Sequence, residues 1–318
     1  MTPKSYKLQK IREFGVEGIL RLIAWTSLVT IILIFIFVGK EALPIFTKPA
    51  ANKDATLGKM FLAQQYKPDR PPKFIWQPES KVPKYSLIPL LVGTLKATLV
   101  AILFAVPISI AAAVYTAEFA KPRLREFIKP AIELLASFPS VVVGFFALIV
   151  LASWIQDTFH LIYRLNVLNA GLALSLAIIP IIYTICEDAL RAVPKSYKEA
   201  SLALGASPWQ TAWKVVLPAA LPGIAAGVVL GFGRAFGETM IVLMAAGNAA
   251  IYNWNFTDSV RTLSATIAGE LAEVVYGGEH YHVLFFIGAL LFVITFLLNL
   301  AGGWYIQRLK KKLSGHLA

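Results

Sequence analysis

The sequence predicts an all-α membrane protein with six membrane-spanning helices, and three observations support this fold class. Hydrophobic residues make up 57% of the 318 residues and charged residues only 15%, a composition too apolar for an ordinary soluble domain. The charged residues fall in clusters, and these clusters separate uncharged runs that are long enough to cross a bilayer. The net charge of +12 is carried by segments that flank these runs, which indicates membrane orientation rather than nucleic-acid binding.

The first span is expected at Leu22–Val38, after a basic N-terminal segment. This order also describes a signal peptide, but the apolar run is longer than usual for one, and the residues around Val38 do not form a small-residue cleavage site. We therefore expect residues 1–40 to hold a cytoplasmic N-terminus and a retained first helix. Residues 41–86 are polar and rich in proline, which predicts an extracytoplasmic connector without regular periodicity.

Residues 87–318 are expected to form a core of five further spans. The predicted spans are Leu87–Ala117, Leu134–Leu151, Leu165–Cys186, Pro222–Gly247 and Val283–Ile306. Lys96 lies near one end of its span, and we expect its ammonium group to reach the membrane surface. Glu118 and Glu133 lie at span edges and are expected to face water or headgroups. Asn299 lies within the last span and has the chemistry to hydrogen-bond across helices.

The distribution of Lys and Arg predicts the orientation of these spans. Cations are frequent in the N-terminal segment, between Lys121 and Lys129, between Arg191 and Lys214, and at the C-terminus. The two short loops on the opposite side hold only Arg164 and Arg261. Because short cytoplasmic loops are enriched in Lys and Arg, both termini and the loop 187–219 are predicted to be cytoplasmic.

The loop 187–219 has the composition of two short helices. Ser196 is the expected cap of a helix over residues 198–204, Gly205 ends it, and the Ser-Pro pair that follows begins another. Such a pair would form a compact knob that exposes Ala, Leu and Trp side chains. On physical grounds alone, it is equally a surface that a partner grips or an amphipathic hairpin lying on the membrane.

The same loop is similar to the EAA loop of ABC-transporter permeases. Glu199-Ala200-Ser201 is followed by three residues, Gly205, nine residues, Val215, one residue and Leu217-Pro218. The family pattern reads EAA, three residues, Gly, nine residues, Ile, one residue and Leu-Pro, so Ser201 and Val215 depart from it without changing the spacing. The resemblance implies a coupling loop that docks in a cleft of a cytoplasmic ATPase dimer, with the contact residues Glu199, Ala200, Ser201, Gly205, Leu217 and Pro218.

The sequence itself predicts neither an enzyme nor a metal site. It contains no G-x-x-x-x-G-K-[ST] phosphate loop, so ATP hydrolysis and the Mg-ATP cofactor are expected on a separate subunit. No Ser/His/Asp or Cys/His arrangement suggests catalysis. Glu279, His280 and His282 lie close in sequence, but no further ligands are spaced to complete a metal site.

The fifth predicted span carries a stripe of small residues. Gly223, Gly227, Gly231 and Ala235 recur at every fourth position after Pro222. Because residues four apart lie on one face of a helix, this stripe lets a second helix approach closely. We therefore expect tight packing along this face of the helix.

The same span contains two charged residues. Arg234 lies about 18 Å along the helix from Pro222, near the middle of an apolar core about 30 Å thick. Glu238 is one turn further on the expected helix, so we expect the two charges to neutralise each other. An unpaired charge at this depth costs at least about 2.5–3.5 kcal/mol. Such a pair either faces a transport pathway or is a structural ion pair between helices.

The chemistry of the pair suits a tetrahedral oxyanion. The planar guanidinium of Arg234 donates paired hydrogen bonds to two oxygens. The carboxylate of Glu238 only accepts hydrogen bonds, so it repels a fully deprotonated anion but accepts an O–H. This difference favours a hydrogen-bearing phosphate over sulfate.

The surrounding residues resemble one family more narrowly. Gly233–Met240 is similar to the G-R-A-x-G-E-T motif of phosphate-transporter permeases, and Phe138–Gly144 is similar to their P-S-V-V-x-G segment. Asn248, Arg261-Thr262-Leu263 and Ile267–Glu270 resemble the PstC-type subunit more than its PstA-type partner. The resemblance covers the chain from Leu87 to the C-terminus.

This resemblance implies a type I ABC-importer permease (MetI-like) fold in the inner membrane, working by alternating access. It implies a pathway that contains Arg234, Glu238 and Thr239. The implied partners are a homologous PstA-type permease, an ATPase dimer and an extracytoplasmic phosphate-binding protein. Two alternatives remain: the same machine importing another oxyanion such as sulfate or molybdate, or a membrane scaffold or sensor that recruits an ATPase. A self-sufficient ion-coupled carrier is disfavoured, because the sequence has no clear internal repeat.

Overall fold

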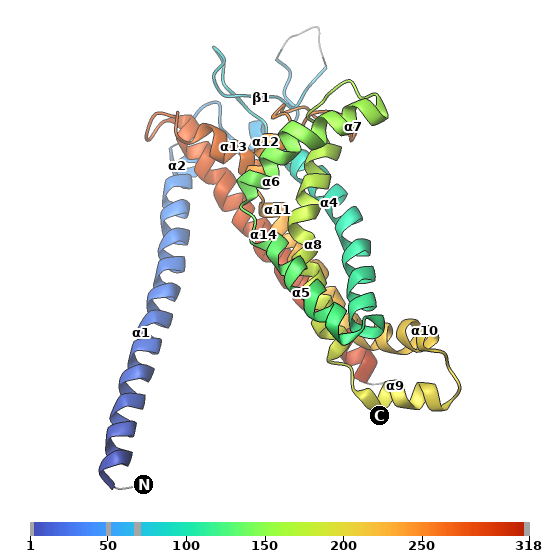
Figure 1. Cartoon of the computed structure of the whole chain (residues 1–318). Helices are drawn as coiled ribbons and strands as arrows, with labels where there is room; N and C mark the ends of the chain where they lie inside the picture. Colours follow the sequence, from blue (N-terminus) through green and yellow to red (C-terminus); the bar gives the residue numbers. More distant parts are fainter. Residues whose placement is uncertain (1–2, 49–51, 67–70, 315–318) are drawn as a thin grey trace.

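Long helices dominate the computed structural model, which describes residues 3–48, 52–66 and 71–314 (Figure 1). Six helical segments are long and apolar enough to cross a membrane, and this confirms the six-span prediction. They are Val16–Thr47, Ile88–Phe119, Ser140–Phe159, Val167–Arg191, Pro208–Gly237 and Glu279–Lys312.

Most of these spans are composed of more than one helical element. The helices are α1 (Pro3–Ala42), α2 (Pro44–Thr47), α3 (Leu57–Phe61), α4 (Ile88–Val114), α5 (Pro122–Ala136), α6 (Ser140–Phe146), α7 (Ala152–Phe159), α8 (Val167–Arg191), α9 (Lys195–Ala203), α10 (Pro208–Thr211), α11 (Leu217–Gly237), α12 (Met240–Ala245), α13 (Leu263–Glu270) and α14 (Glu279–Ser314). Short π-helical segments extend α4, link α6 to α7 and link α10 to α11; they are η1 (Tyr115–Phe119), η2 (Ala147–Leu151) and η3 (Ala212–Val216).

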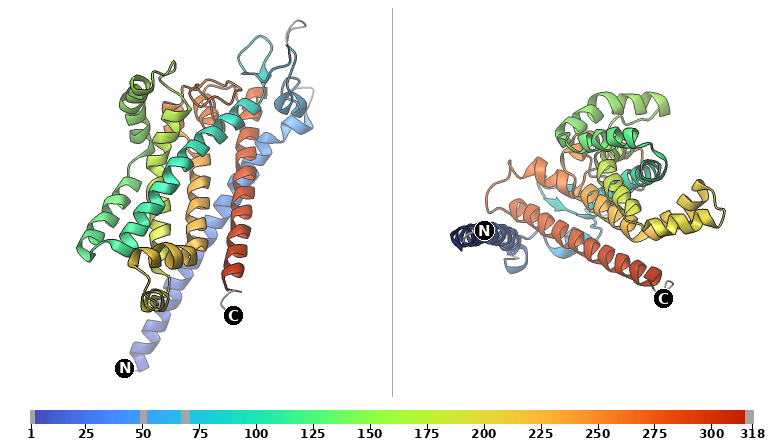
Figure 2. Two further views of the ribbon diagram at one scale, coloured as in Figure 1. Left: turned by 90° about the vertical axis from the view of Figure 1, so that its right-hand side faces the viewer. Right: turned by 60° about the horizontal axis from the view of Figure 1, so that its bottom comes forward.

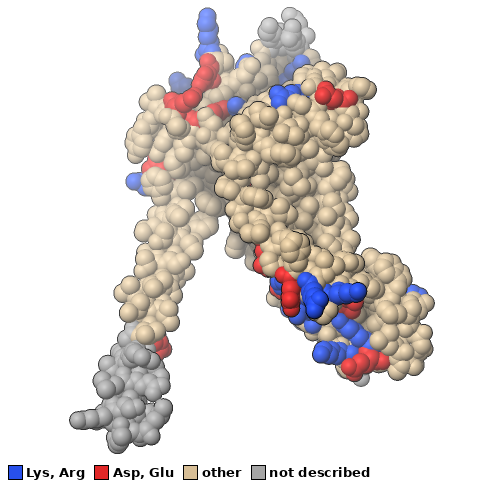
Figure 3. Space-filling model, viewed as in Figure 1, with Lys and Arg blue, Asp and Glu red and all other residues tan. Residues whose placement is uncertain are grey.

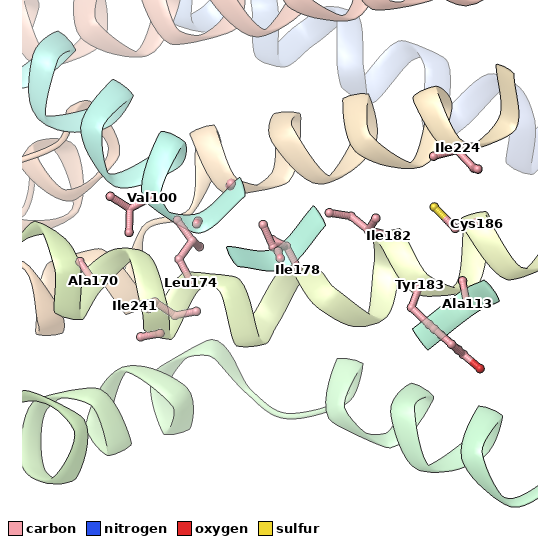
Figure 4. Packing of buried hydrophobic residues seen from close by; sticks show 14 of the residues in the cluster. Val100, Ala113, Ala170, Leu174, Ile178, Ile182, Tyr183, Cys186, Ile224 and Ile241 are labelled. Carbon is pink, nitrogen blue, oxygen red and sulfur yellow. The ribbon is translucent and has the colours of Figure 1, made fainter. Parts of the chain in front are cut away.

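The core of the bundle is built around α8, which packs against α4 on one side and α11 on the other. Leu174, Ile178 and Ile182 of α8 are fully buried between these helices (Figure 4). The first turn of α8 is capped by Asn166, whose side chain accepts a hydrogen bond from the backbone N–H of Asn169. This cap satisfies one of the donors that a helix start leaves unpaired.

The small-residue stripe of the fifth span packs as the sequence predicts. A Cβ atom placed on Gly223 would overlap the Cβ of Ala189, and one on Gly231 would lie 2.6 Å from the side chain of Ile182. Both neighbours belong to α8. The absence of side chains at these positions therefore lets the backbones of α8 and α11 approach closely.

The third span differs from the prediction of Leu134–Leu151. Most of the cation-rich segment 121–129, which was expected to be a loop, and the first residues of the expected span lie instead in α5. This helix is amphipathic and has no buried residue. The chain then breaks before α6, where Pro139 adopts φ −58° and ψ 134°. Proline lacks an N–H and disfavours the helical conformation in the residue before it. The span consequently starts at Ser140 and ends at Phe159.

The connector 41–86 is folded onto the bundle rather than loose. It contributes α2, α3 and a hairpin of β1 (Trp76–Gln77) and β2 (Lys84–Tyr85), in which Trp76 lies opposite Tyr85. Its apolar side chains form a second buried cluster with the start of α14 and with α13; the cluster includes Ile45, Met60, Trp76, Tyr85, Leu263, Val283 and Ile287. The short elements explain why the sequence shows no periodicity here.

The first helix stands apart from the other spans. α1 contacts α14 near its C-terminal end, where Phe35 lies 4.8 Å from Phe292 between ring centroids. The N-terminal part of α1 diverges from the bundle (Figures 1 and 2). Its side chains from Val16 to Ile36 are exposed. This apolar surface requires lipid or another protein chain around it.

Charged residues lie at the two ends of the bundle. On the face shown in Figure 3, Lys, Arg, Asp and Glu gather at both ends, and the surface between them carries almost no charged side chains. The beginning of α1 and the end of α14 lie at the end of the bundle that also carries α9 (Figure 1). A charge-free belt between two charged ends is the surface that a bilayer requires.

Candidate functional site

The fifth span, expected as one helix over residues 222–247, is broken in its second half. α11 ends at Gly237, Glu238 adopts φ −66° and ψ 136°, and α12 begins at Met240. At the break, the hydroxyl of Ser264 on α13 donates a hydrogen bond of 2.7 Å to the backbone carbonyl of Glu238. The carbonyl at the end of α11 is thus satisfied from another helix. The expected continuous helix is therefore wrong.

Arg234 precedes this break and Glu238 lies in it, and the two side chains do not pair. The side chain of Arg234 lies on the last turn of α11 and is exposed on the surface of the single chain, whereas Glu238 and Thr239 are half-buried. Among the described residues, the side chains of Arg234 and Glu238 have no hydrogen bond or ion pair. The expected neutralisation is wrong, because the helix ends between the two residues and Glu238 leaves the helical path.

The groups around Arg234 are able to hydrogen-bond an oxyanion. Asn299 of α14 lies against α11, with its Oδ1 3.7 Å from the position that a Cβ on Gly233 would take. Its side chain is exposed. The Thr239 hydroxyl donates to the carbonyl of Gly237 at 3.4 Å, a long hydrogen bond that is readily exchanged. A guanidinium, an amide and a hydroxyl therefore lie on or beside the same end of α11.

The contact of Ser264, and the helix α13 over residues 263–270 that carries it, were not predicted from the sequence. Thr262 caps α13 by accepting from the backbone N–H of Ala265, and the N–H of Leu263 donates to the hydroxyl of Thr94 on α4 at 3.0 Å. These bonds fix α13 against α4 and hold Ser264 at the break. A Ser or Thr near the start of a short helix is a common pattern, so this contact has no sequence signal of its own.

Lys96 is buried rather than extended to the membrane surface. Its side chain is 0% exposed and its ammonium group donates to the carbonyls of Asn253 and Asn255 at 3.2 and 2.6 Å, and to the Asn253 side chain at 3.0 Å. These three acceptors replace the water that the ammonium would otherwise bind. The expectation for Lys96 is therefore wrong, and its actual role is to hold the loop between α12 and α13.

The predicted coupling loop forms a helical hairpin. α9 starts at Lys195 with Pro194 at the cap position, two positions earlier than the expected Ser196 cap, and Gly205 turns the chain with φ +84°. Ser207 caps α10 in a complete capping box with Gln210. α10, η3 and α11 then continue as one helix, so Leu217 and Pro218 lie within the fifth span.

The hairpin presents the apolar surface that the sequence predicts. Leu204 is 90% exposed and Trp209 is 61% exposed, and both lie at the tip around Gly205. Glu199 and Ala200 are exposed on α9. Ser201 points inward instead, and its hydroxyl lies 2.9 Å from the hydroxyl of Thr211, with both residues buried.

Ion pairs join the hairpin and α5 to the core. Lys198 of α9 lies 2.6 Å from Glu118 at the end of the second span, so Glu118 faces the hairpin and not water as expected. Glu133 is exposed, as expected. Lys129 of α5 pairs with Glu187 and Asp188 of α8 at 2.8 and 2.9 Å. Its hydrogen bonds to these two carboxylates raise the pKa of Lys129 above its ordinary value.

At the opposite end of the bundle, Glu270 binds the connector to the core. Its carboxylate accepts from the indole N–H of Trp76 at 3.2 Å, pairs with His280 at 2.9 Å and forms an ion pair with Arg261. Burial raises the pKa of Glu270, but the hydrogen bonds from His280 and Trp76 and the charge of Arg261 outweigh burial and lower it. The described residues contain no group of three potential metal ligands.

Comparison with known proteins places this arrangement in a family. Residues 105–314 match the family described as "Binding-protein-dependent transport system inner membrane component". The probable ABC transporter permease protein YqgH of Bacillus subtilis is 37% identical over 222 residues, which are 70% of this chain and 72% of that protein. The phosphate transport system permease protein PstC of Mesorhizobium japonicum is 33% identical over 303 residues, 89% of each chain.

A solved structure supports the predicted fold. A chain of the MetNI methionine ABC transporter in an inward-facing conformation superposes with a TM-score of 0.55 and 22% identity, covering 69% of this chain and 96% of that chain. This likeness, together with the family match, confirms the predicted MetI-like permease fold. The chain therefore belongs to the family of inner-membrane components of binding-protein-dependent transport systems, and within it to the PstC-type permeases.

Proposed function

We propose that this chain is a membrane permease subunit of an ATP-driven importer of inorganic phosphate and forms part of the translocation pathway. The observation that carries this proposal is the exposed guanidinium of Arg234, which ends an otherwise apolar helix and has no ionic partner among the described residues. A lone charge is costly against lipid. Arg234 therefore faces a hydrated pathway between this chain and a second permease.

The break between α11 and α12 supports an oxyanion as the transported solute. Transporter sites are commonly built from interrupted helices, because backbone and side-chain groups at the interruption are free to contact the solute. In our proposal Arg234 donates to two phosphate oxygens, Thr239 donates to a third, and Glu238 accepts the proton of hydrogenphosphate. Affinity stays weak at this point, since a tight site in the pathway would trap the ion.

The orientation follows from the distribution of cations and from the fold. The start of α1, the end of α14 and the coupling hairpin lie at one end of the bundle, and the short loops at this end are rich in Lys and Arg. This end is cytoplasmic in our proposal, and the folded connector is extracytoplasmic.

The family works with an ATPase and a solute-binding protein. We infer that the hairpin tip, with Leu204 and Trp209, docks in an ATPase dimer, which closes on ATP and moves the hairpin. The ion pair between Lys198 and Glu118 passes this movement to the second span. A PstA-type permease covers the exposed side of α11 and the divergent part of α1, and a phosphate-binding protein delivers the ion at the connector end.

Uptake of labelled phosphate by proteoliposomes tests this function. The complex is reconstituted with ATP inside, and excess unlabelled sulfate or molybdate is added outside. We expect ATP-dependent uptake that resists both competitors and is lost in Arg234→Gln, while Arg308→Gln, which removes a cation at the end of α14, leaves uptake unchanged. Uptake abolished by sulfate would replace phosphate by another oxyanion. An intact complex that hydrolyses ATP without any transport would favour a scaffold or sensor.

A further inference from the structure

A cavity of about 600 Å³ lies beside the coupling hairpin, away from the break at Glu238. It opens between the end of α8, the first turns of α11, the start of α9 and the end of α14. Its walls are almost entirely apolar and include Ala189, Val193, Pro218, Ala219 and Pro222. A hydrocarbon chain is the kind of group that such walls accommodate.

The charged side chains among the described residues that line this cavity have the same sign. Lys214 of η3 and Lys310 of α14 are the charged residues among the described residues that line it, and no Asp or Glu lines it. Both lysine side chains are exposed. The cavity thus combines an apolar interior with a cationic rim, and this combination matches an anionic amphiphile.

The residues beside the cavity have the composition of a membrane–water interface. Its lining residues come from the end of α8, the start of α9, the first half of the fifth span and the end of α14, on the side of the bundle with the coupling hairpin. On α14, the exposed Trp304 and Tyr305 precede Lys310 by less than two turns, and Arg308 stacks on the Trp304 ring at 3.5 Å. Exposed Trp and Tyr side chains followed by cations are typical of a membrane–water interface.

We propose that this cavity binds one anionic phospholipid, with an acyl chain against the apolar walls and the headgroup phosphate between Lys214 and Lys310. Basic pockets between spanning helices are suited to anionic headgroups. A free phosphate ion fits poorly, because the apolar walls offer no further donors to replace its hydration. The ATPase is also a poor occupant, since the exposed tip residues Leu204 and Trp209 do not line the cavity.

This site has a consequence for the coupling hairpin. Tyr197 of α9 and Lys214 of η3, which belong to its two arms, both line the cavity. A bound lipid therefore contacts both arms at once and ties them to the end of α14. Occupancy by anionic lipid is expected to hold the hairpin in place relative to the membrane.

Native mass spectrometry of the purified full chain tests this site. Phosphatidylglycerol and phosphatidylcholine with the same acyl chains are titrated in detergent, and retained lipid is counted. We expect one phosphatidylglycerol to be retained in preference to phosphatidylcholine, and the double variant Lys214→Ala/Lys310→Ala to weaken its retention about tenfold or more. The matched control is Lys121→Ala/Arg123→Ala, which removes two exposed cations at the same end of the bundle outside the cavity and should have no effect.

A second variant tests the binding of the acyl chain to the apolar walls separately from the binding of the headgroup to the cations. Ala192 is exposed at the end of α8 and lines the cavity. The larger side chain in Ala192→Trp therefore occupies the cavity without disturbing the buried core of the bundle. We expect this variant to lose the retained phosphatidylglycerol although both lysines remain. Equal retention of the two lipids, unchanged retention in Ala192→Trp, or displacement of the lipid by millimolar inorganic phosphate would each overturn the proposal.

Discussion

Ser201 shows how a single departure from a family pattern is accommodated. The EAA pattern has an alanine at this position, and here the serine hydroxyl lies 2.9 Å from that of Thr211 inside the hairpin. Both residues are buried, so neither hydroxyl has ready access to water. The pair therefore joins α9 to α10 by a contact that requires both hydroxyl groups.

We expect Ser201→Ala to lower the free energy of unfolding by about 1–3 kcal/mol, because Thr211 would be left as a buried hydroxyl without its partner. The double variant Ser201→Ala/Thr211→Val removes both hydroxyls, and we expect it to recover most of the loss. Thermal unfolding of the wild type, Ser201→Ala, Thr211→Val and the double variant measures this coupling. Additive effects of the two substitutions would show that the hydroxyls do not interact.

The prediction for Glu238 concerns the choice between phosphate and sulfate. Its side chain has no ionic partner among the described residues. In our proposal its carboxylate repels a fully deprotonated anion. Glu238→Gln removes that charge, and we expect sulfate to inhibit phosphate uptake on the order of tenfold more strongly, which corresponds to about 1.4 kcal/mol. Competition curves in proteoliposomes measure this change. Unchanged sulfate inhibition would remove Glu238 from the selection of the anion.

At the scale of elements, the contact between α8 and α11 determines how the core closes. Gly223 of α11 meets Ala189 of α8, and Gly231 meets Ile182 two turns further on. Helices in a membrane gain little from burying apolar surface against each other, so close packing of small residues supplies much of their association.

We expect Gly223→Ala to destabilise the protein by about 1–3 kcal/mol, because the added methyl group overlaps the Cβ of Ala189. The exchange variant Gly223→Ala/Ala189→Gly restores the space and should recover stability. Gly303→Ala on α14 is the matched control, because a Cβ at that glycine meets nothing within 4 Å. Thermal unfolding in detergent compares the variants. Equal loss in Gly223→Ala and Gly303→Ala would contradict the packing argument.

At the scale of the whole molecule, the two ends of the bundle are held by different ionic contacts. Glu270 joins Trp76 of the connector to Arg261 and His280 of the core. At the hairpin end, Lys198 joins α9 to Glu118. Each end thus carries a separate element whose position depends on charged groups at the edge of the membrane.

The lowered pKa of Glu270 makes the connector end sensitive to acid. Because its pKa in the folded protein lies below the ordinary value of 4.5, the ionised carboxylate stabilises the fold above that pH, and this stability is lost as the pH falls through the folded pKa. We expect Glu270→Gln to cost about 2–3 kcal/mol at neutral pH and less in acid. Unfolding midpoints measured between neutral pH and about pH 3 test this. Glu273→Gln, an exposed neighbour, is the control, and parallel curves for wild type and Glu270→Gln would contradict the prediction.

Much of the fold was predictable because membrane insertion imposes a simple rule on the sequence. Six apolar runs, the Gly223–Ala235 stripe and the hairpin around Gly205 all follow from local composition and spacing. The motif spacing around Glu199 indicates the family through residues that lie within one short loop. Each of these features depends on residues that are close to one another along the chain.

The errors share a physical cause. At the break in the fifth span, the hydroxyl of Ser264, which is distant in sequence, donates a hydrogen bond to the carbonyl of Glu238. Lys96 is buried because the loop with Asn253 folds over it. A short stretch of sequence shows which groups are polar, but it does not show which groups distant along the chain form hydrogen bonds with them.

The sequence by itself therefore determined that this chain spans a membrane with six helices, and by resemblance it indicates which residues are expected to meet an ATPase. Only the tertiary structure decided that Arg234 and Glu238 are separate groups at a helix break, that the connector is a folded cap, and that Lys214 and Lys310 share one cavity. The physical reason is the separation along the chain between the residues that interact. Hydrophobicity and helix periodicity act between near neighbours, whereas hydrogen-bond partners and cavities arise from segments that only the complete fold brings together.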